Sequence, residues 1–261
     1  MKTLTGIVAI FCLSSININA QVGISVSPPR VYYEVNPGQT GENEINITNA
    51  SEKHTLDLSL TLGDWTYNTS GENVVYPPDS CAGWVSIMGA SYLSLKPKET
   101  RSVKVNITVP QDLNDSIPVH TAMLYVTQMN PIDDVDAKGA NIKVSIRSGI
   151  KLFHRKHGSR IRKIEISNFL WKEKNNELLL EFTNEGNVWL DGSVKPYLFN
   201  KSTGNEVSLT DVAFYTMPQD KRILRIPTLK SLEKGDYVAT VLLDYGDKNN
   251  IEAAELQFTH E

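Results

Sequence analysis

Apolar and polar residues alternate along most of this chain, the pattern of β-strands with one buried face. Leucines occupy every second position from Leu56 to Leu62, and a second row runs from Val103 to Val109. Because successive side chains of a strand point to opposite faces, each row forms one face. The apolar run Met123–Val126 predicts a strand buried on both faces. No sustained helical period precedes residue 158.

A second series of alternating segments occupies the last hundred or so residues. We expect strands over 161–170, 177–182, 193–199, 221–226, 237–244 and 251–258. Turns rich in Asn, Gly and Pro separate the strands in both halves of the chain. The pattern therefore predicts an all-β protein made of two β-sandwiches.

A signal peptide before the first sandwich and a hinge after it are indicated by the sequence. Lys2, the apolar run Leu4–Leu13 and small residues up to Ala20 have the order of a secretory signal peptide. The apolar run is too short to span a bilayer, and no second one of ~20 residues follows. The polar segment Lys156–Arg160 predicts a hinge. We expect a cleaved signal peptide over residues 1–20, a first domain over 21–156 and a second over 157–261, in a protein that is exported and not membrane-spanning.

Composition and motifs narrow the function classes. Cys81 is the only cysteine after residue 20, so no intramolecular disulfide is expected, and the formal net charge of −4 argues against a nucleic-acid binder. No phosphate-binding loop, G-x-S-x-G elbow or H-E-x-x-H pair is present. The histidines, at positions 54, 120, 154, 157 and 260, lack the spacing of metal ligands. We expect no enzyme activity, no cofactor and no metal.

The most informative segment runs from Ala140 to Arg155. Ile142, Val144 and Ile146 alternate with polar residues, and Lys151 follows five positions after Ile146. Such an apolar row faces either the core of its own domain or, at a sheet edge, a strand of another protein. The alternation itself is compatible with both.

Three motifs, taken in order, resemble the PapD-like periplasmic pilus-assembly chaperones. The run 149–155 reads G-I-K-L-F-H-R, the run 27–33 reads S-P-P-R-V-Y-Y, and Trp84 leads through Leu93 and Leu95 into the Val103 strand. His154 stands where the family has an aromatic residue, and Lys156 where a proline often follows. The resemblance covers about residues 22–156, and the second domain is less typical.

The resemblance implies two Ig-like sandwiches and a chaperone that caps subunits of a fimbria or another surface organelle in the periplasm. It implies that Arg30 and Lys151 bind the terminal carboxylate of the client subunit. It further implies that Ile142, Val144 and Ile146 form the donor strand, which fills a groove in that client. An outer-membrane assembly platform is a further partner that the resemblance implies.

Other classes remain open at this point. A structural or adhesive Ig-like protein, extracellular or on the cell surface, would have the same strand pattern without a folding role. The row at Ile142 would then pack into its own sandwich. A secreted hydrolase or carbohydrate binder on a sandwich scaffold is a third class, for which the sequence offers no site.

Overall fold

A computed structural model describes residues 23–74, 80–113, 116–135, 139–229, 232–246 and 251–261. The expected signal peptide over residues 1–20 lies outside the described residues. In the part of the chain that the structure describes, no helix is long and apolar enough to cross a membrane.

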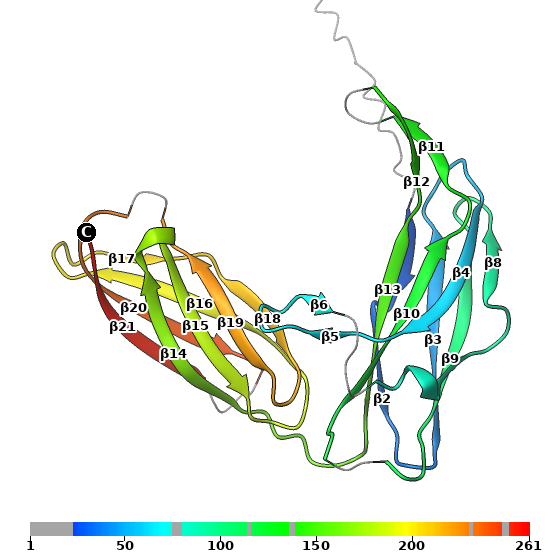
Figure 1. Cartoon of the computed structure of the whole chain (residues 1–261), viewed down its shortest axis with the longest axis horizontal. Coiled ribbons are helices and arrows are strands. Elements are labelled where there is room, and N and C mark those ends of the chain that lie inside the picture. The colour runs from blue at the N-terminus through cyan, green and yellow to red at the C-terminus, as the bar shows by residue number, and fades with distance from the viewer. Residues whose placement is uncertain (1–22, 75–79, 114–115, 136–138, 230–231, 247–250) are drawn as a thin grey trace, which may run out of the picture.

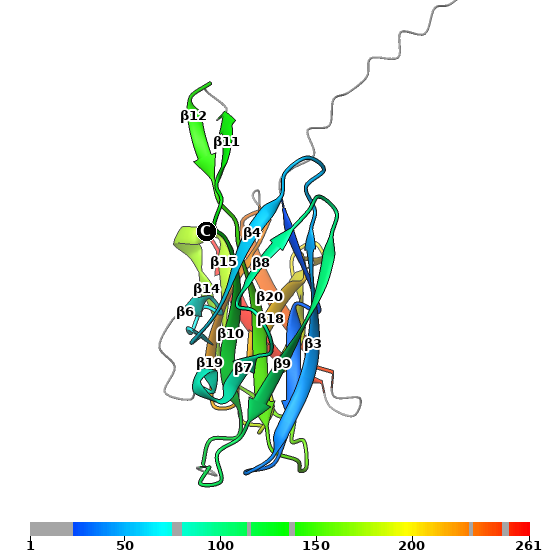
Figure 2. The ribbon, with the colours of Figure 1, turned by 90° about the vertical axis from the view of Figure 1, so that its right-hand side faces the viewer.

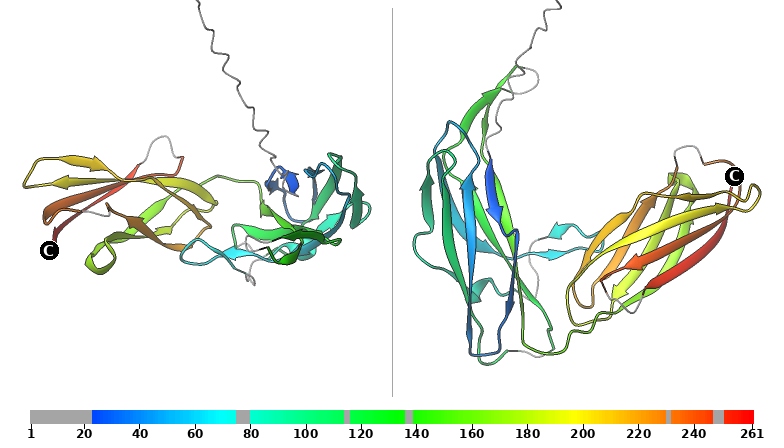
Figure 3. Two further views of the ribbon diagram at one scale, coloured as in Figure 1. Left: turned by 90° about the horizontal axis from the view of Figure 1, so that it is seen from above. Right: turned by 180° about the vertical axis from the view of Figure 1, so that it is seen from behind.

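The chain is all-β and folds into two β-sandwiches, which confirms the predicted fold class. The sandwiches stand at an angle to one another and are joined by the linker after β13 (Arg147–Arg155), as Figure 1 and the reverse view in Figure 3 show. Regular secondary structure other than strands is limited, in the described residues, to two 3-10 turns, Ala82–Trp84 and Glu173–Asn175. The domain limits expected from the sequence stay a prediction.

The first sandwich packs two sheets face to face. One sheet has the order β1-β3-β9-β7, formed by Ile24–Ser27, Thr40–Asn49, Thr100–Thr108 and Val85–Ile87. The other has the order β2-β13-β10-β4-β8 and adds Arg30–Glu34, His120–Gln128, Leu56–Gly63 and Tyr92–Leu95 to β13. The predicted leucine and valine rows lie in β4 and β9 and are buried at Leu56, Leu58, Leu60, Val103, Val105 and Ile107.

The second sandwich is built in the same way. One sheet has the order β14-β15-β19, formed by Ile164–Lys172, Glu177–Asn184 and Lys221–Pro227. The other has the order β17-β16-β20-β21, formed by Glu206–Ser208, Leu190–Asn200, Gly235–Asp244 and Glu252–His260, with β18 (Val212–Thr216) also paired to β16. Each of the six segments expected to be strands in this half overlaps one.

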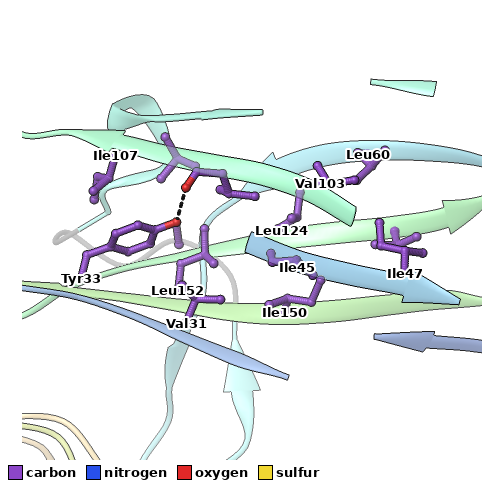
Figure 4. Packing of buried hydrophobic residues seen from close by; sticks show 14 of the residues in the cluster. Val31, Tyr33, Ile45, Ile47, Leu60, Val103, Ile107, Leu124, Ile150 and Leu152 are labelled. Atoms are coloured by element: carbon purple, nitrogen blue, oxygen red, sulfur yellow. Dashed lines mark hydrogen bonds between the residues drawn. The ribbon is translucent and has the colours of Figure 1, made fainter. Parts of the chain in front are cut away.

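The core of the first sandwich is filled from both sheets (Figure 4). Val31, Ile45, Leu124 and Leu152 are almost fully buried, and burying each such side chain contributes roughly 1.5–3 kcal/mol. The one polar atom that Tyr33 brings into this core is satisfied, because its hydroxyl donates to the Val105 carbonyl at 2.8 Å. Cys81 lies in the same core with its thiol reduced, and burial raises its pKa to about 12.

Two hairpins leave the sandwiches. The first, β11 (Ile132–Val135) with β12 (Asn141–Val144), projects beyond the first sandwich, as Figure 2 shows. The second, β5 (Thr66–Tyr67) with β6 (Asn73–Val74), reaches from the first sandwich to the second (Figure 1). There the Ile223 amide of β19 donates to the Thr69 carbonyl at 2.8 Å. The sequence predicted neither hairpin.

The segment Ala140–Arg155 is two strands and not one. β12 ends at Val144 and β13 begins at Arg147, with Ser145 and Ile146 between them. Gln128 of β10 holds this break: its carbonyl accepts from the Ser145 hydroxyl at 2.7 Å, and its amide donates to the Ile146 carbonyl at 2.8 Å. The backbone therefore has partners at the point where the strand is interrupted.

The linker is fixed to both sandwiches. Glu34, on β2, pairs with Arg155 at 3.3 Å and with Arg160. Asn187, in the turn before β16, exchanges backbone and side-chain hydrogen bonds with Ile161 and donates to the Ser159 carbonyl at 3.0 Å. The predicted hinge thus has its own contacts at both ends.

A buried histidine pair connects β10 and β13. His120 and His154 are register partners, 4% and 0% exposed, with ring centroids 5.6 Å apart, and the Trp84 ring contacts both. His154 Nε2 meets the Val35 carbonyl at 2.9 Å, whereas neither Nδ1 atom has a hydrogen-bond partner among the described residues. Burial lowers the pKa of His120 to about 4, helped by His154, and burial also lowers the pKa of His154.

Acidification should therefore destabilise the first sandwich. Because both folded-state pKa values lie below the unfolded value of about 6.5, the stability from the neutral pair is complete above pH 6.5 and is lost as pH falls towards 4. Replacing His120→Phe should reduce the slope by up to about 1.4 kcal/mol per pH unit. Urea unfolding at pH 7, 6 and 5 measures this slope. An equal slope in wild type and variant would contradict the expectation.

Candidate functional site

Arg30 and Lys151 lie side by side on two neighbouring strands. β2 pairs with β13 in parallel, Arg30 and Lys151 are register partners, and the Lys151 amide donates to the Pro29 carbonyl at 3.2 Å. Register partners point to the same face of a sheet. The residues that follow, Val31 and Leu152, are buried in the core, so Arg30 and Lys151 point away from it. The structure thus brings together two residues that are about 120 positions apart in sequence.

Lys151 occupies an aromatic environment. Its Nζ donates to the Tyr67 hydroxyl at 2.9 Å and lies 4.4 Å from the ring centroids of both Trp65 and Tyr67. Its pKa is lowered to about 8, mainly by burial and also by the positive charge of Arg30, while Asp191 acts in the opposite direction. Lys151 is therefore a half-buried cation that has aromatic faces and one hydroxyl around it.

Arg30 is held by the second sandwich. Its Nη1 pairs with the carboxylate of Asp191, at the start of β16, and its guanidinium lies 4.6 Å from the ring centroid of Tyr215 on β18. Asp191 and Tyr215 are themselves register partners. A carboxylate and a ring from the second sandwich thus face a cation of the first.

An aromatic stack continues this contact. Tyr32 lies between Phe153, at 5.1 Å, and Trp189 of the second sandwich, at 4.9 Å between ring centroids. Trp65 packs edge-on against Phe153 at 5.3 Å. Phe153 and Trp65, with Trp189 packed against them, belong to a small apolar cluster on the outer face of β13. Within this cluster, the Trp65 ring lies against the Lys151 ammonium.

Arg222, on β19, fastens the β5–β6 hairpin across the two sandwiches. It is 1% exposed, pairs with Asp220 at 2.6 Å and donates to the Asn68 carbonyl at 2.6 Å, and its guanidinium lies 5.0 Å from the Tyr67 ring centroid. Burial lowers its pKa, and Asp220 opposes this effect. Arg222 therefore fixes the hairpin that brings the Tyr67 hydroxyl to Lys151.

The predicted donor-strand residues lie on the projecting hairpin and at its base. Ile142 is 39% exposed, and Val144 and Ile146 are partly exposed. Among the described residues, no strand pairs with the second edge of β12, and β13 gains its partner β2 only from Lys151 onward. Within the described part of the chain, one edge is thus without a paired strand from residue 141 to residue 150, and it ends at Arg30 and Lys151.

Sequence reasoning missed the residues that surround the two cations. The alternation Trp65-Thr66-Tyr67 was a signal for a strand with two aromatic side chains on one face. Asp191 and Arg222 have no such signal, because their role depends on how the sandwiches meet. Within the described residues, no group of three or more His, Cys, Asp or Glu side chains is placed to hold a metal ion.

The Lys151 ammonium should titrate well below an ordinary lysine. In a protein with ¹³C-labelled lysine, its Cε signal should have a midpoint near pH 8. Removing the neighbouring cation with Arg30→Gln should raise that midpoint, and removing the carboxylate with Asp191→Asn should lower it. A midpoint near the ordinary lysine value of about 10.4, unchanged in both variants, would contradict this environment.

Comparison with known proteins adds information at the level of fold. No protein-family model and no curated protein matches this sequence. Among solved structures, the YadV chaperone covers 89% of this chain and 99% of its own at a TM-score of 0.50 and 15% identity. A chaperone–tip adhesin complex of CFA/I fimbriae biogenesis covers 92% of this chain and 99% of its own, at a TM-score of 0.48 and 11% identity. The CsuC–CsuE chaperone–tip subunit complex of Acinetobacter baumannii covers 90% of this chain and 98% of its own, also at a TM-score of 0.48 and 11% identity.

These identities are low, so the likeness concerns the fold and not the site. The YadV likeness spans both sandwiches, including the half of the chain in which the sequence motifs are less typical. The predicted resemblance to the PapD-like periplasmic chaperones is therefore confirmed in the fold of this chain.

Proposed function

We propose that this protein is a periplasmic chaperone, without enzyme activity, that caps subunits of a fimbria or a related surface organelle. The observation that carries the proposal is a strand edge that no strand of the described residues pairs with and that ends at two adjacent cations. The edge would bind a strand of the client, and Arg30 with Lys151 would bind the carboxylate at the end of that strand.

The backbone geometry suits strand addition. An unpaired edge offers backbone N–H and C=O groups to another strand. β2 fills this position from Arg30 onward and runs parallel to β13. A client strand that fills the position before Arg30 and ends at the cations must also run parallel to β13, with its carboxyl end at Lys151.

The two cations would set the register of that strand. Arginine binds a carboxylate through charge-assisted hydrogen bonds, and a partly buried lysine adds a second positive charge. A slip of one residue would turn every client side chain to the wrong face. A carboxylate fixed at Arg30 and Lys151 prevents this slip.

The donor strand would supply the apolar contact. Burying Ile142, Val144 and Ile146 against a client would contribute roughly 1.5–3 kcal/mol for each fully buried side chain. Their present partial burial reduces that gain, and association costs at least about 4 kcal/mol. Binding of this strength is reversible, as capping and release of subunits require.

Substitution of the cations tests the anchor. When the tagged protein is expressed in the periplasm, Lys151→Met and Arg30→Gln should each reduce capture of exported subunits at least about tenfold, because a buried charge pair is lost. Lys163→Met, an exposed lysine of the linker, should capture like wild type. Quantitative mass spectrometry of the captured proteins gives the ratio. Undiminished capture by both anchor variants would contradict the carboxylate anchor, and absence of any exported subunit would favour the adhesive alternative.

Substitution on the projecting hairpin tests the donor strand. Ile142→Asn should weaken capture of the same subunits several-fold while changing the free energy of unfolding by less than about 0.5 kcal/mol, because Ile142 is already exposed. Lys143→Asn changes the neighbouring side chain, which points to the opposite face, and should leave capture unchanged. Equal capture by the two variants would contradict a role for the apolar row.

A further inference from the structure

The charges at the meeting of the two sandwiches are nearly balanced. Three cations gather there: Arg30, Lys151 and Arg222. Two carboxylates of the second sandwich compensate two of them, since Asp191 pairs with Arg30 and Asp220 pairs with Arg222 at 2.6 Å. In the described residues Lys151 has the Tyr67 hydroxyl as its polar partner and no ion pair. The site therefore has one positive charge in excess.

Asp191 already occupies the place that a client carboxylate needs. Its side chain remains 48% exposed, and its partner Arg30 is 25% exposed. The Tyr215 ring covers one face of the guanidinium, 4.6 Å away. A client carboxylate that binds Arg30 on the side where Asp191 already pairs must either displace the Asp191 carboxylate or lie next to it. In the second case the two negative charges repel each other.

We propose that Asp191 is an internal competitor for the carboxylate anchor and is an affinity-determining residue of the client site. The inference rests on the proposed function, which it deepens. In the free protein Asp191 neutralises Arg30 and ties the two sandwiches together. A client terminus displaces it from Arg30 while binding to Lys151, so the affinity is lower than the two cations alone would give.

The same charge balance limits the class of client. With Asp191 present, the excess of one positive charge suits a terminus that carries a single carboxylate. An acidic side chain next to that carboxylate would bring a second negative charge near Asp191. The competitor therefore selects termini whose last side chains are uncharged.

A small carboxylate isolates this effect from strand pairing. N-acetylphenylalanine and N-acetylphenylalaninamide share the ring and differ in the carboxylate, and either can be titrated into the mature chain at pH 6.5, where Lys151 is protonated. Shifts of the Lys151 Cε signal report binding. The dissociation constant of the carboxylate should fall roughly five- to tenfold in Asp191→Asn, from the loss of one exposed ion pair and of the repulsion beside it. The amide should bind weakly and equally to both forms.

Two variants serve as controls for the charge of Asp191. Glu185→Gln removes one exposed negative charge from the turn before β16 and should behave like wild type, and Asp191→Glu keeps the charge and should do the same. One outcome is that binding of the carboxylate depends on Lys151 and is still equal or weaker in Asp191→Asn. That result would overturn the competitor role of Asp191 and leave the proposed function intact. Absence of any difference between the carboxylate and the amide in every form would overturn both the anchor and the competitor.

Discussion

The parallel pairing of β2 with β13 is the constraint on which the candidate site depends. It sets Arg30 beside Lys151, and its starting point decides how much of β13 remains open. Pro28 and Pro29 lack a backbone N–H and cannot donate to β13, although the Pro29 carbonyl still accepts from the Lys151 amide. The preceding strand, Ile24–Ser27, pairs instead with β3 in the other sheet. The change of sheet at these prolines thus ends the pairing at the residue where the cations lie.

At neutral pH, Lys151 lowers the stability of the free protein. Its folded-state pKa of about 8 lies below the ordinary lysine value, so the unfolded chain binds its proton more readily between pH 8 and about 10.4. The stability contributed by this residue is complete above pH 10.4 and is lost as pH falls to 8. At neutral pH the ammonium is thus destabilising, and a carboxylate partner relieves that penalty. A residue that costs stability in the free protein is typical of a binding site.

The sequence predicted the strands of both sandwiches but not the contacts between them. Alternation shows which residues of a strand share a face, so the rows at Leu56 and Val103 were sufficient to predict β4 and β9. It does not show what covers the outer face of β13. The break at Ser145 depends on the side chain and backbone of Gln128, which comes from another strand. Arg30 was found only through a family motif, and Asp191, 161 positions away, only in the folded chain.

In the proposed function, the second sandwich would turn Arg30 and Lys151, two cations of the first sandwich, into a carboxylate anchor. Without the second sandwich, Arg30 and Lys151 would be more hydrated, and in water a carboxylate gains little from either. Trp189 and Tyr215 approach from the second sandwich, and Arg222 holds the hairpin of Tyr67 over Lys151. This cover lowers the local dielectric constant and strengthens the attraction of a carboxylate. Because Asp191 lies on the same sandwich, the placement of the second sandwich would set both the strength of the proposed anchor and the strength of its proposed competitor.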